Sequence, residues 1–391
     1  MRKDLRSAQW QRKSYLEPSD ILSGTDSWVG PWSCFPSFYS ATIKAVLKTC
    51  VYPQHVVQRN QQLDRAKGVF VFLVVLGHML AAVSPWESDL LRVLQTVIYS
   101  FHIPAFVFLT GITAKSGKIP QRVTFFLVLL ATALPLYYGW MSLLGLNPDF
   151  EFMVPYWLTW FLLSMVWWTL SVPLIERFPR AVLGLSVLIA LFGGVIPAWD
   201  YELSLSRTLS FWVFFVVGKL YGSRIISWAG RRTPGQKGGL ALIAATPMLL
   251  FYLADPNKLW FYGARNFDWF DVTVGEGVAA RLIVGLSAAL STVALCAFLA
   301  NMPDYLGTVG RRSLAVYLLH GFVVRLLDIW FDDSLDYVPS PVMLLACLML
   351  AIMTTWLFSL RPFNAGLRAY GEGAAAVILR PFSRSRSTQG S

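Results

Sequence analysis

Charged residues are scarce in this sequence, and that scarcity excludes most soluble folds. Only 14% of the 391 residues are charged, while 55% are hydrophobic. A soluble domain usually carries about 25% charged residues on its surface. The chain is therefore expected to be an integral membrane protein. Its formal charge of +11 is assigned to cytoplasmic loops and not to a nucleic-acid partner.

Cysteine is also rare, with four residues in the chain. Cys34 and Cys50 precede the first long apolar run, whereas Cys296 and Cys347 lie within apolar runs. There is no Cys-x-x-Cys pair and no Cys/His spacing typical of zinc, so neither a metal site nor a disulfide framework is predicted. The first 25 residues mix charges without an apolar core, which is not the pattern of a signal peptide.

Long apolar runs are abundant instead, and they predict an all-α polytopic membrane protein of about ten transmembrane helices. The expected spans are 67–84, 90–114, 123–144, 155–175, 181–197, 205–222, 239–254, 278–300, 313–331 and 341–360.

The loops between these spans alternate in charge. Loops 115–122, 176–180, 219–238 and 301–312 hold twelve Lys or Arg and two acidic residues, whereas the opposite set holds two basic and thirteen acidic residues. Because Lys and Arg collect in cytoplasmic loops, the basic side and both termini are assigned to the cytoplasm.

This assignment gives three parts. They are a cytoplasmic segment 1–66, a transmembrane domain 67–360, and a cytoplasmic tail 361–391 with a disordered tip. The longest external loop, 255–276, is rich in aromatic residues. It either covers a site or forms an interfacial aromatic belt.

An ionisable residue inside a span is costly and points to function. Lys67 and His78 are eleven residues apart, almost three helical turns, so they share one face of the first span. The rise between them is about 16 Å. Lys67 is thus expected at the cytoplasmic mouth and His78 near the midplane. That arrangement suits an anionic molecule that enters from the cytoplasm and presents its reactive end to His78.

Two other spans carry polar stripes, which either line a site or hold helices together. The spacing i, i+4, i+7 occurs in Gln95, Tyr99 and His102, and again in Ser313, Tyr317 and His320. Asp64 precedes His78 by fourteen residues, about 21 Å along a continuous helix, which is too far to orient its ring. Asp64 is instead expected to pair with Lys67 or Arg59 and to support the start of the helix.

These residues lie in motifs that resemble the acyltransferase-3 superfamily of membrane acyltransferases. RNQQLDRAKGVFVFLVVLGHML resembles its first-span signature, and SFHIPAFVFLTGITAK resembles the second-span motif of its fucose 4-O-acetylase-like branch. Three later motifs of the family also have similar segments in this chain. They are WLTWFLLSMVWW, RTLSFWVFFVVGKLYG, which begins at Arg207, and LGTVGRRSLAVYLLHGF. The five motifs occur in the family's order and cover roughly 59 to 360.

The resemblance implies an enzyme of the cytoplasmic (plasma) membrane that moves an acyl group, usually acetyl, from acyl-CoA to a hydroxyl of an envelope sugar, glycan or glycolipid. It implies that His78 is the catalytic histidine and Lys67 its paired cation. It also implies that His102, Ser313, Tyr317 and His320 line the site. No metal is implied.

Chemistry adds roles to these residues. An imidazole, with an ordinary pKa of about 6.5, can take the proton of a hydroxyl that attacks a thioester. His102 or Tyr317 is a candidate donor to the resulting oxyanion. The CoA phosphates require cations, for which Lys67, Lys115, Lys118, Arg122, Arg311 and Arg312 are available.

Two questions stay open at this point. Arg207, at the outer end of its span, either holds the acceptor or stabilises the acidic external loops. The alternative function is a proton-coupled transporter or flippase of an envelope glycolipid, with the histidines as a proton relay.

Overall fold

The computed structural model describes residues 61–83, 89–146, 148–151, 153–330 and 338–387, and these residues form helices with no strand among them. Residues 1–60 of the predicted segment 1–66, including Arg59, lie outside this part of the chain. The helices run in the order α3 (Gln61–Val83), α4 (Asp89–Tyr99), α5 (His102–Thr113), α6 (Ile119–Leu143), α7 (Trp160–Arg177), α8 (Pro179–Phe192), α9 (Leu205–Gly230), α10 (Pro234–Ala254), α11 (Leu259–Tyr262), α12 (Val274–Phe298), α13 (Asp304–Arg311), α14 (Ser313–Trp330), α15 (Ser340–Phe358) and α16 (Arg361–Ser387).

The all-α polytopic membrane fold is confirmed. Within the described residues, eight helical segments are long and apolar enough to cross a membrane. They are Gln61–Val83, Asp89–Thr113, Ile119–Leu143, Trp157–Arg177, Glu202–Gly230, Pro234–Ala254, Val274–Asn301 and Ser340–Phe358. The two other predicted spans correspond to α8, which has 14 residues, and α14, which contains Arg325 and Asp328.

Several helix bounds differ from the predicted spans. α3 begins at Gln61, six residues before the predicted start, so His78 lies in the last third of the described helix. α9 continues to Gly230 through part of the predicted loop 219–238. The predicted C-terminal tail forms α16, a 27-residue helix that lies along α6.

The second predicted span is broken in the middle. α4 ends at Tyr99 and α5 begins at His102. Pro104 has no N–H to donate to the carbonyl of Ser100, and its ring would clash with that carbonyl in a continuous helix. The break therefore follows from the sequence Ser-Phe-His-Ile-Pro, and it places His102 at a helix start.

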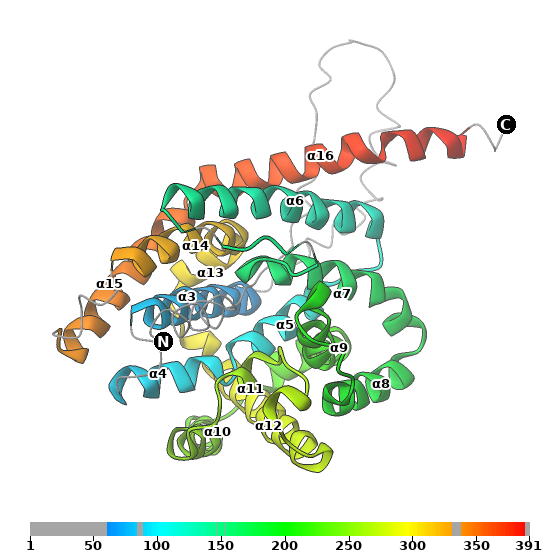
Figure 1. Ribbon diagram of the computed structural model, residues 1–391. Helices are drawn as coiled ribbons and strands as arrows, with labels where there is room; N and C mark the ends of the chain where they lie inside the picture. Colours follow the sequence, from blue (N-terminus) through cyan, green and yellow to red (C-terminus); the bar gives the residue numbers. More distant parts are fainter. Residues whose placement is uncertain (1–60, 84–88, 147, 152, 331–337, 388–391) are drawn as a thin grey trace, which may run out of the picture.

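α3 lies at the centre of the bundle and contacts α4, α5, α13, α14 and α15 (Figure 1). α5 packs closely on α9 because two glycines face the opposite backbone. A Cβ on Gly218 would lie 2.0 Å from the carbonyl oxygen of Phe108, and one on Gly111 would lie 2.2 Å from that of Phe215. The central position of α3 surrounds His78 with protein and not with lipid.

Candidate active site

The side chains of His78 and His320 form a buried pair. His78 is 1% exposed and His320 is fully buried. Nδ1 of His78 lies 2.9 Å from Nε2 of His320, and the two rings are stacked with centroids 5.1 Å apart. Residues 242 positions apart in the sequence thus meet between α3 and α14.

The hydrogen bonds of this pair fix where its protons lie. Nδ1 of His320 is 2.7 Å from the carbonyl oxygen of Tyr317 and 3.0 Å from that of Val316. A carbonyl accepts only, so Nδ1 of His320 carries the proton and, in the neutral ring, its Nε2 is an acceptor. His78 must then donate from Nδ1, which leaves a lone pair on its Nε2.

Nε2 of His78 has no hydrogen-bond partner among the described residues, although it is buried. Buried polar atoms of this kind are uncommon and call for an explanation. An unprotonated imidazole nitrogen of this kind is chemically able to accept a proton.

His102, the first residue of α5, resembles His78 in having one ring nitrogen engaged and the other without a partner. Its Nδ1 donates to the carbonyl oxygen of Ile98 at 2.7 Å, and its Nε2 is buried without a partner in the described chain. Its ring lies edge-on to that of Tyr99, with centroids 4.9 Å apart. In this tautomer Nε2 has no proton, so His102 is a second acceptor and not the expected donor to an oxyanion.

The late-span stripe contributes mainly through His320. The hydroxyl of Tyr317 donates to the carbonyl oxygen of Leu158, so its proton is already engaged. Ser313 donates to the carbonyl oxygen of Gly310 at 2.9 Å, at the start of α14. Both side chains are buried. In this arrangement neither hydroxyl proton is available to an oxyanion.

The residues expected to bind CoA lie at the N-terminal end of α3, on the α5–α6 connection and in the first turn of α6. Lys67 is buried at 3% exposure. Asp64, one turn earlier, lies 3.9 Å from Arg311 of α13, so the basic end of α13 comes close to the start of α3. Lys115 is exposed, and Arg122 donates to its carbonyl oxygen.

Arg207 belongs to an aromatic cluster in the first turn of α9. It is 2% exposed, and its guanidinium lies 5.1 Å from the ring centroids of both Trp160 and Tyr201. Arg265 lies over the same Tyr201 ring at 4.1 Å. Tyr201 thus contacts two arginines, one from α9 and one from the aromatic loop.

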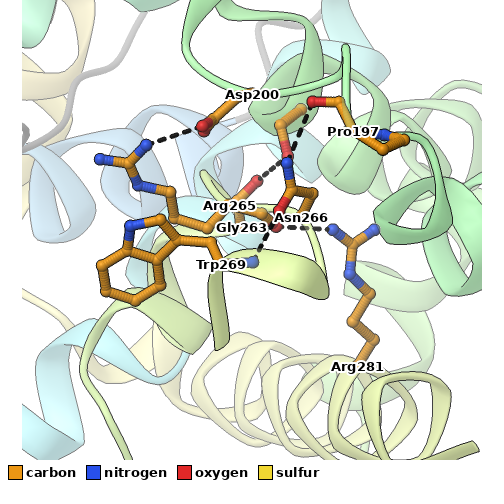
Figure 2. Close-up of polar contacts among 8 residues, drawn as sticks. Pro197, Asp200, Gly263, Arg265, Asn266, Trp269 and Arg281 are labelled. Carbon is orange, nitrogen blue, oxygen red and sulfur yellow. Dashed lines mark hydrogen bonds and ion pairs between the residues drawn. The ribbon is translucent and has the colours of Figure 1, made fainter. Parts of the chain in front are cut away.

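Figure 2 shows how the aromatic loop 255–273 is attached. Arg265 forms an ion pair of 2.7 Å with Asp200, and Asn266 donates to the carbonyl oxygen of Pro197. Arg281 of α12 donates to the carbonyl oxygen of Arg265 at 3.1 Å. These bonds tie the loop both to the segment before α9 and to α12.

The same loop reaches the neighbourhood of His102. The ring of Tyr262 lies 5.5 Å from that of Tyr99, which in turn contacts His102. Phe261 and Tyr262 are both 2% exposed. Of the two interpretations of this loop, a cover and an interfacial belt, these contacts favour the cover.

Sequence reasoning missed Arg325. This side chain is 3% exposed, and its guanidinium lies 4.0 Å from the centroid of Trp157. The Trp157 ring is 5.3 Å from that of His78. The sequence did contain an indication of this residue, because Arg325 and Asp328 are charged residues at i, i+3 inside an apolar run.

No group of three or more His, Cys, Asp or Glu that could hold a metal ion is found in the described part of the chain.

A comparison of the sequence with known protein families gives one match. The family described as an acyltransferase domain, acyltransferase-3, matches residues 60–360. The chain belongs to the acyltransferase-3 family. It is therefore a membrane acyltransferase, and the match covers every helix from α3 to α15. Searches of curated proteins and of solved structures found no match.

Proposed function

We propose that this acyltransferase moves an acetyl group from cytoplasmic acyl-CoA to a hydroxyl of an envelope sugar, glycan or glycolipid, as the fucose 4-O-acetylase-like branch of the family would. The enzyme lies in the cytoplasmic membrane with both termini in the cytoplasm. The observation that carries the proposal is the buried, unprotonated Nε2 of His78.

In the proposed reaction His78 is a general base. Its Nε2 takes the proton of the acceptor hydroxyl while the hydroxyl oxygen attacks the thioester carbon. The C–S bond of the tetrahedral intermediate then breaks. The CoA thiolate receives the proton from the His78 imidazolium, and the products are an ester and free CoA. No protein atom is acylated in this direct transfer.

The donor enters from the end of α3 that carries Lys67. The charge alternation of the loops supports this direction, because the basic loops lie at that end. Lys67, Lys115 and Arg122 contact the CoA phosphates in this proposal. The acidic loops and the anchored aromatic loop lie at the opposite end, from which the acceptor enters.

The test uses the purified full chain, acetyl-CoA labelled in the acetyl group and methyl glycosides as acceptors, with no ion gradient. Wild-type protein is expected to release CoA and transfer label. His78→Gln, which keeps a polar side chain without a basic ring, should lower kcat by about a hundredfold or more. Retained turnover in a folded His78→Gln protein would remove His78 from the mechanism.

The same assay separates the proposal from transport. A proton-coupled transporter or flippase would leave acetyl-CoA intact without a gradient. Membership of the acyltransferase-3 family supports transfer over transport.

A further inference from the structure

We infer that Arg325, supported by Asp328, is the site that holds the acceptor through a second hydroxyl, beside the hydroxyl that reacts at His78. The ligand class is a neutral polyhydroxylated compound, such as a sugar ring. This inference rests on the proposed function, because it concerns the acceptor of that reaction.

The first argument is the set of hydrogen-bond donors on Arg325. Its Nη1 is engaged by Asp328 at 2.6 Å, with both side chains at most 10% exposed. Its Nε and Nη2 are buried and have no hydrogen-bond partner among the described residues. Each buried donor left without a partner costs about 1–3 kcal/mol. The Trp157 and Tyr156 rings, at 4.0 Å and 5.4 Å from the guanidinium, offset part of this cost. A bound hydroxyl would provide the hydrogen-bond partner that the rings do not.

The second argument is position. Arg325 lies on α14 one and a half turns beyond His320, away from the end of the site that carries Lys67. The Trp157 ring separates it from His78, at 4.0 Å from the guanidinium and 5.3 Å from the imidazole. Both groups thus contact the same Trp157 ring, and the proposal requires a ligand that presents one hydroxyl to His78 and another to Arg325.

The third argument is that the chain holds Trp157 in a costly conformation at this place. Trp157 has φ of 43°, in the left-handed region that bulky residues avoid. Gly321, next to His320, leaves room for its ring, because a Cβ there would lie 2.6 Å from Cζ3 of Trp157. Strain of this kind clusters at functional sites, where it fixes a geometry.

The charges select the class of ligand. Asp328 balances the charge of Arg325, so the pair has no net charge to attract a phosphate or carboxylate. What is left is a set of N–H donors, which suits a hydroxyl oxygen. The site therefore favours a neutral sugar hydroxyl over an anionic substituent.

The experiment measures acetyl transfer from labelled acetyl-CoA to methyl glycosides of glucose, galactose and fucose, and to their monodeoxy analogues. Arg325→Lys keeps the charge that balances Asp328 but loses the planar fork of donors. It should raise KM for the best methyl glycoside about 10- to 100-fold, with KM for acetyl-CoA unchanged. Arg368→Lys is the matched control, because Arg368 is likewise paired with an acidic residue of its own helix, Glu372 of α16 at 3.8 Å, and it should leave both KM values unchanged.

The deoxy analogues provide a second readout that does not depend on a fold defect. With wild-type protein, KM for one deoxy analogue should be about tenfold or more above KM for its parent glycoside. With Arg325→Lys, the analogue and its parent should have almost the same KM. The difference is expected to disappear because the variant lacks the guanidinium that binds this hydroxyl.

Each other outcome overturns the inference. An unchanged glycoside KM in Arg325→Lys, or a changed acetyl-CoA KM, would show that Arg325 does not hold the acceptor. Wild-type protein that hydrolyses acetyl-CoA but acylates no glycoside would refute the acceptor class while donor use survives. Wild-type protein that leaves acetyl-CoA intact would refute the proposed function itself.

Discussion

The imidazole of His320 sets the protonation of His78 through one hydrogen bond, 2.9 Å between Nε2 of His320 and Nδ1 of His78. The carbonyl oxygens of Val316 and Tyr317 hold the proton of His320 on its Nδ1. The order carbonyl, His320, His78 has the same logic as a catalytic triad, in which a third group orients the base and selects its tautomer.

Removal of His320 should therefore lower the rate without affecting donor binding. We expect His320→Ala to reduce kcat for acetyl transfer about 10- to 100-fold, because His78 would lose the acceptor that selects its tautomer. KM for acetyl-CoA should stay within about twofold. The measurement is steady-state kinetics with labelled acetyl-CoA.

His320→Gln is the diagnostic partner of that variant. Its amide oxygen can accept the proton of His78 Nδ1, so it should recover part of the lost kcat. A purely structural role of His320 would leave Ala and Gln equally impaired at equal thermal stability, and that result would contradict the orienting role.

The sequence predicted the helices better than it predicted their contacts. The Lys67 to His78 spacing singled out His78 as a candidate from one helix alone, and its catalytic role stays a prediction. The residue that contacts His78 could not be predicted, because the sequence did not show which of the two polar stripes lies against the first span. The structure pairs His78 with His320 of α14. Which helices are adjacent depends on packing across the whole bundle, and periodicity carries no information about it.

The break before His102 and the burial of Arg325 were not predicted, for different reasons. Hydropathy averages over a window, so the span 90–114 reads as continuous although Pro104 interrupts its hydrogen bonds. Arg325 lies near the end of a span, where an arginine usually extends to the membrane interface. Its burial against Trp157 becomes visible only when the start of α7 is placed beside α14.

Gly321→Ala should destabilise the protein, since the added methyl group meets three side chains. Its Cβ would lie 2.2 Å from the Tyr137 hydroxyl, 2.6 Å from Leu158 and 2.6 Å from Trp157. Overpacking of this kind costs about 1–3 kcal/mol. Tm measured in detergent should fall, and kcat should fall with it because Trp157 contacts His78.

Gly139→Ala is the control for this substitution. No atom lies within 4 Å of a Cβ at Gly139, which lies inside α6 one turn before its end. Alanine there should keep activity and leave Tm unchanged or slightly higher, since alanine favours a helix over glycine by about 1 kcal/mol. Equal Tm values for the two variants would contradict the steric argument at Gly321.

Lys67→Ala should weaken acyl-CoA binding if Lys67 contacts its phosphates. A charge-assisted hydrogen bond contributes about 1.5–3 kcal/mol, so KM for acetyl-CoA should rise about tenfold or more. Arg224→Ala removes an exposed positive charge from the distal part of α9 and should leave that KM unchanged. An unaltered KM in Lys67→Ala would restrict Lys67 to a role in packing or topology.

The ion pair between Arg265 and Asp200 predicts that replacing the arginine destabilises the protein more than replacing the aspartate. It also predicts that the effect of replacing the arginine depends on pH. Burial raises the pKa of Asp200 above its ordinary value of 3.8, and the guanidinium of Arg265 opposes that shift without cancelling it. Because burial disfavours this carboxylate, Asp200→Asn should change the free energy of unfolding little at pH 7. Arg265→Ala leaves the carboxylate without the cation at 2.7 Å and should cost about 1–2 kcal/mol.

The sign of the pH dependence follows from the raised pKa. A carboxyl whose pKa is higher in the folded state is disfavoured when ionised, and this penalty disappears as the pH falls through the folded pKa. The Tm deficit of Arg265→Ala relative to wild type should therefore shrink as the pH is lowered from 7 toward 4, and it should be absent in the double variant Arg265→Ala/Asp200→Asn. A deficit that stays constant over this range, or that persists in the double variant, would show that Arg265 stabilises the loop through Tyr201 and Trp269 and not through Asp200.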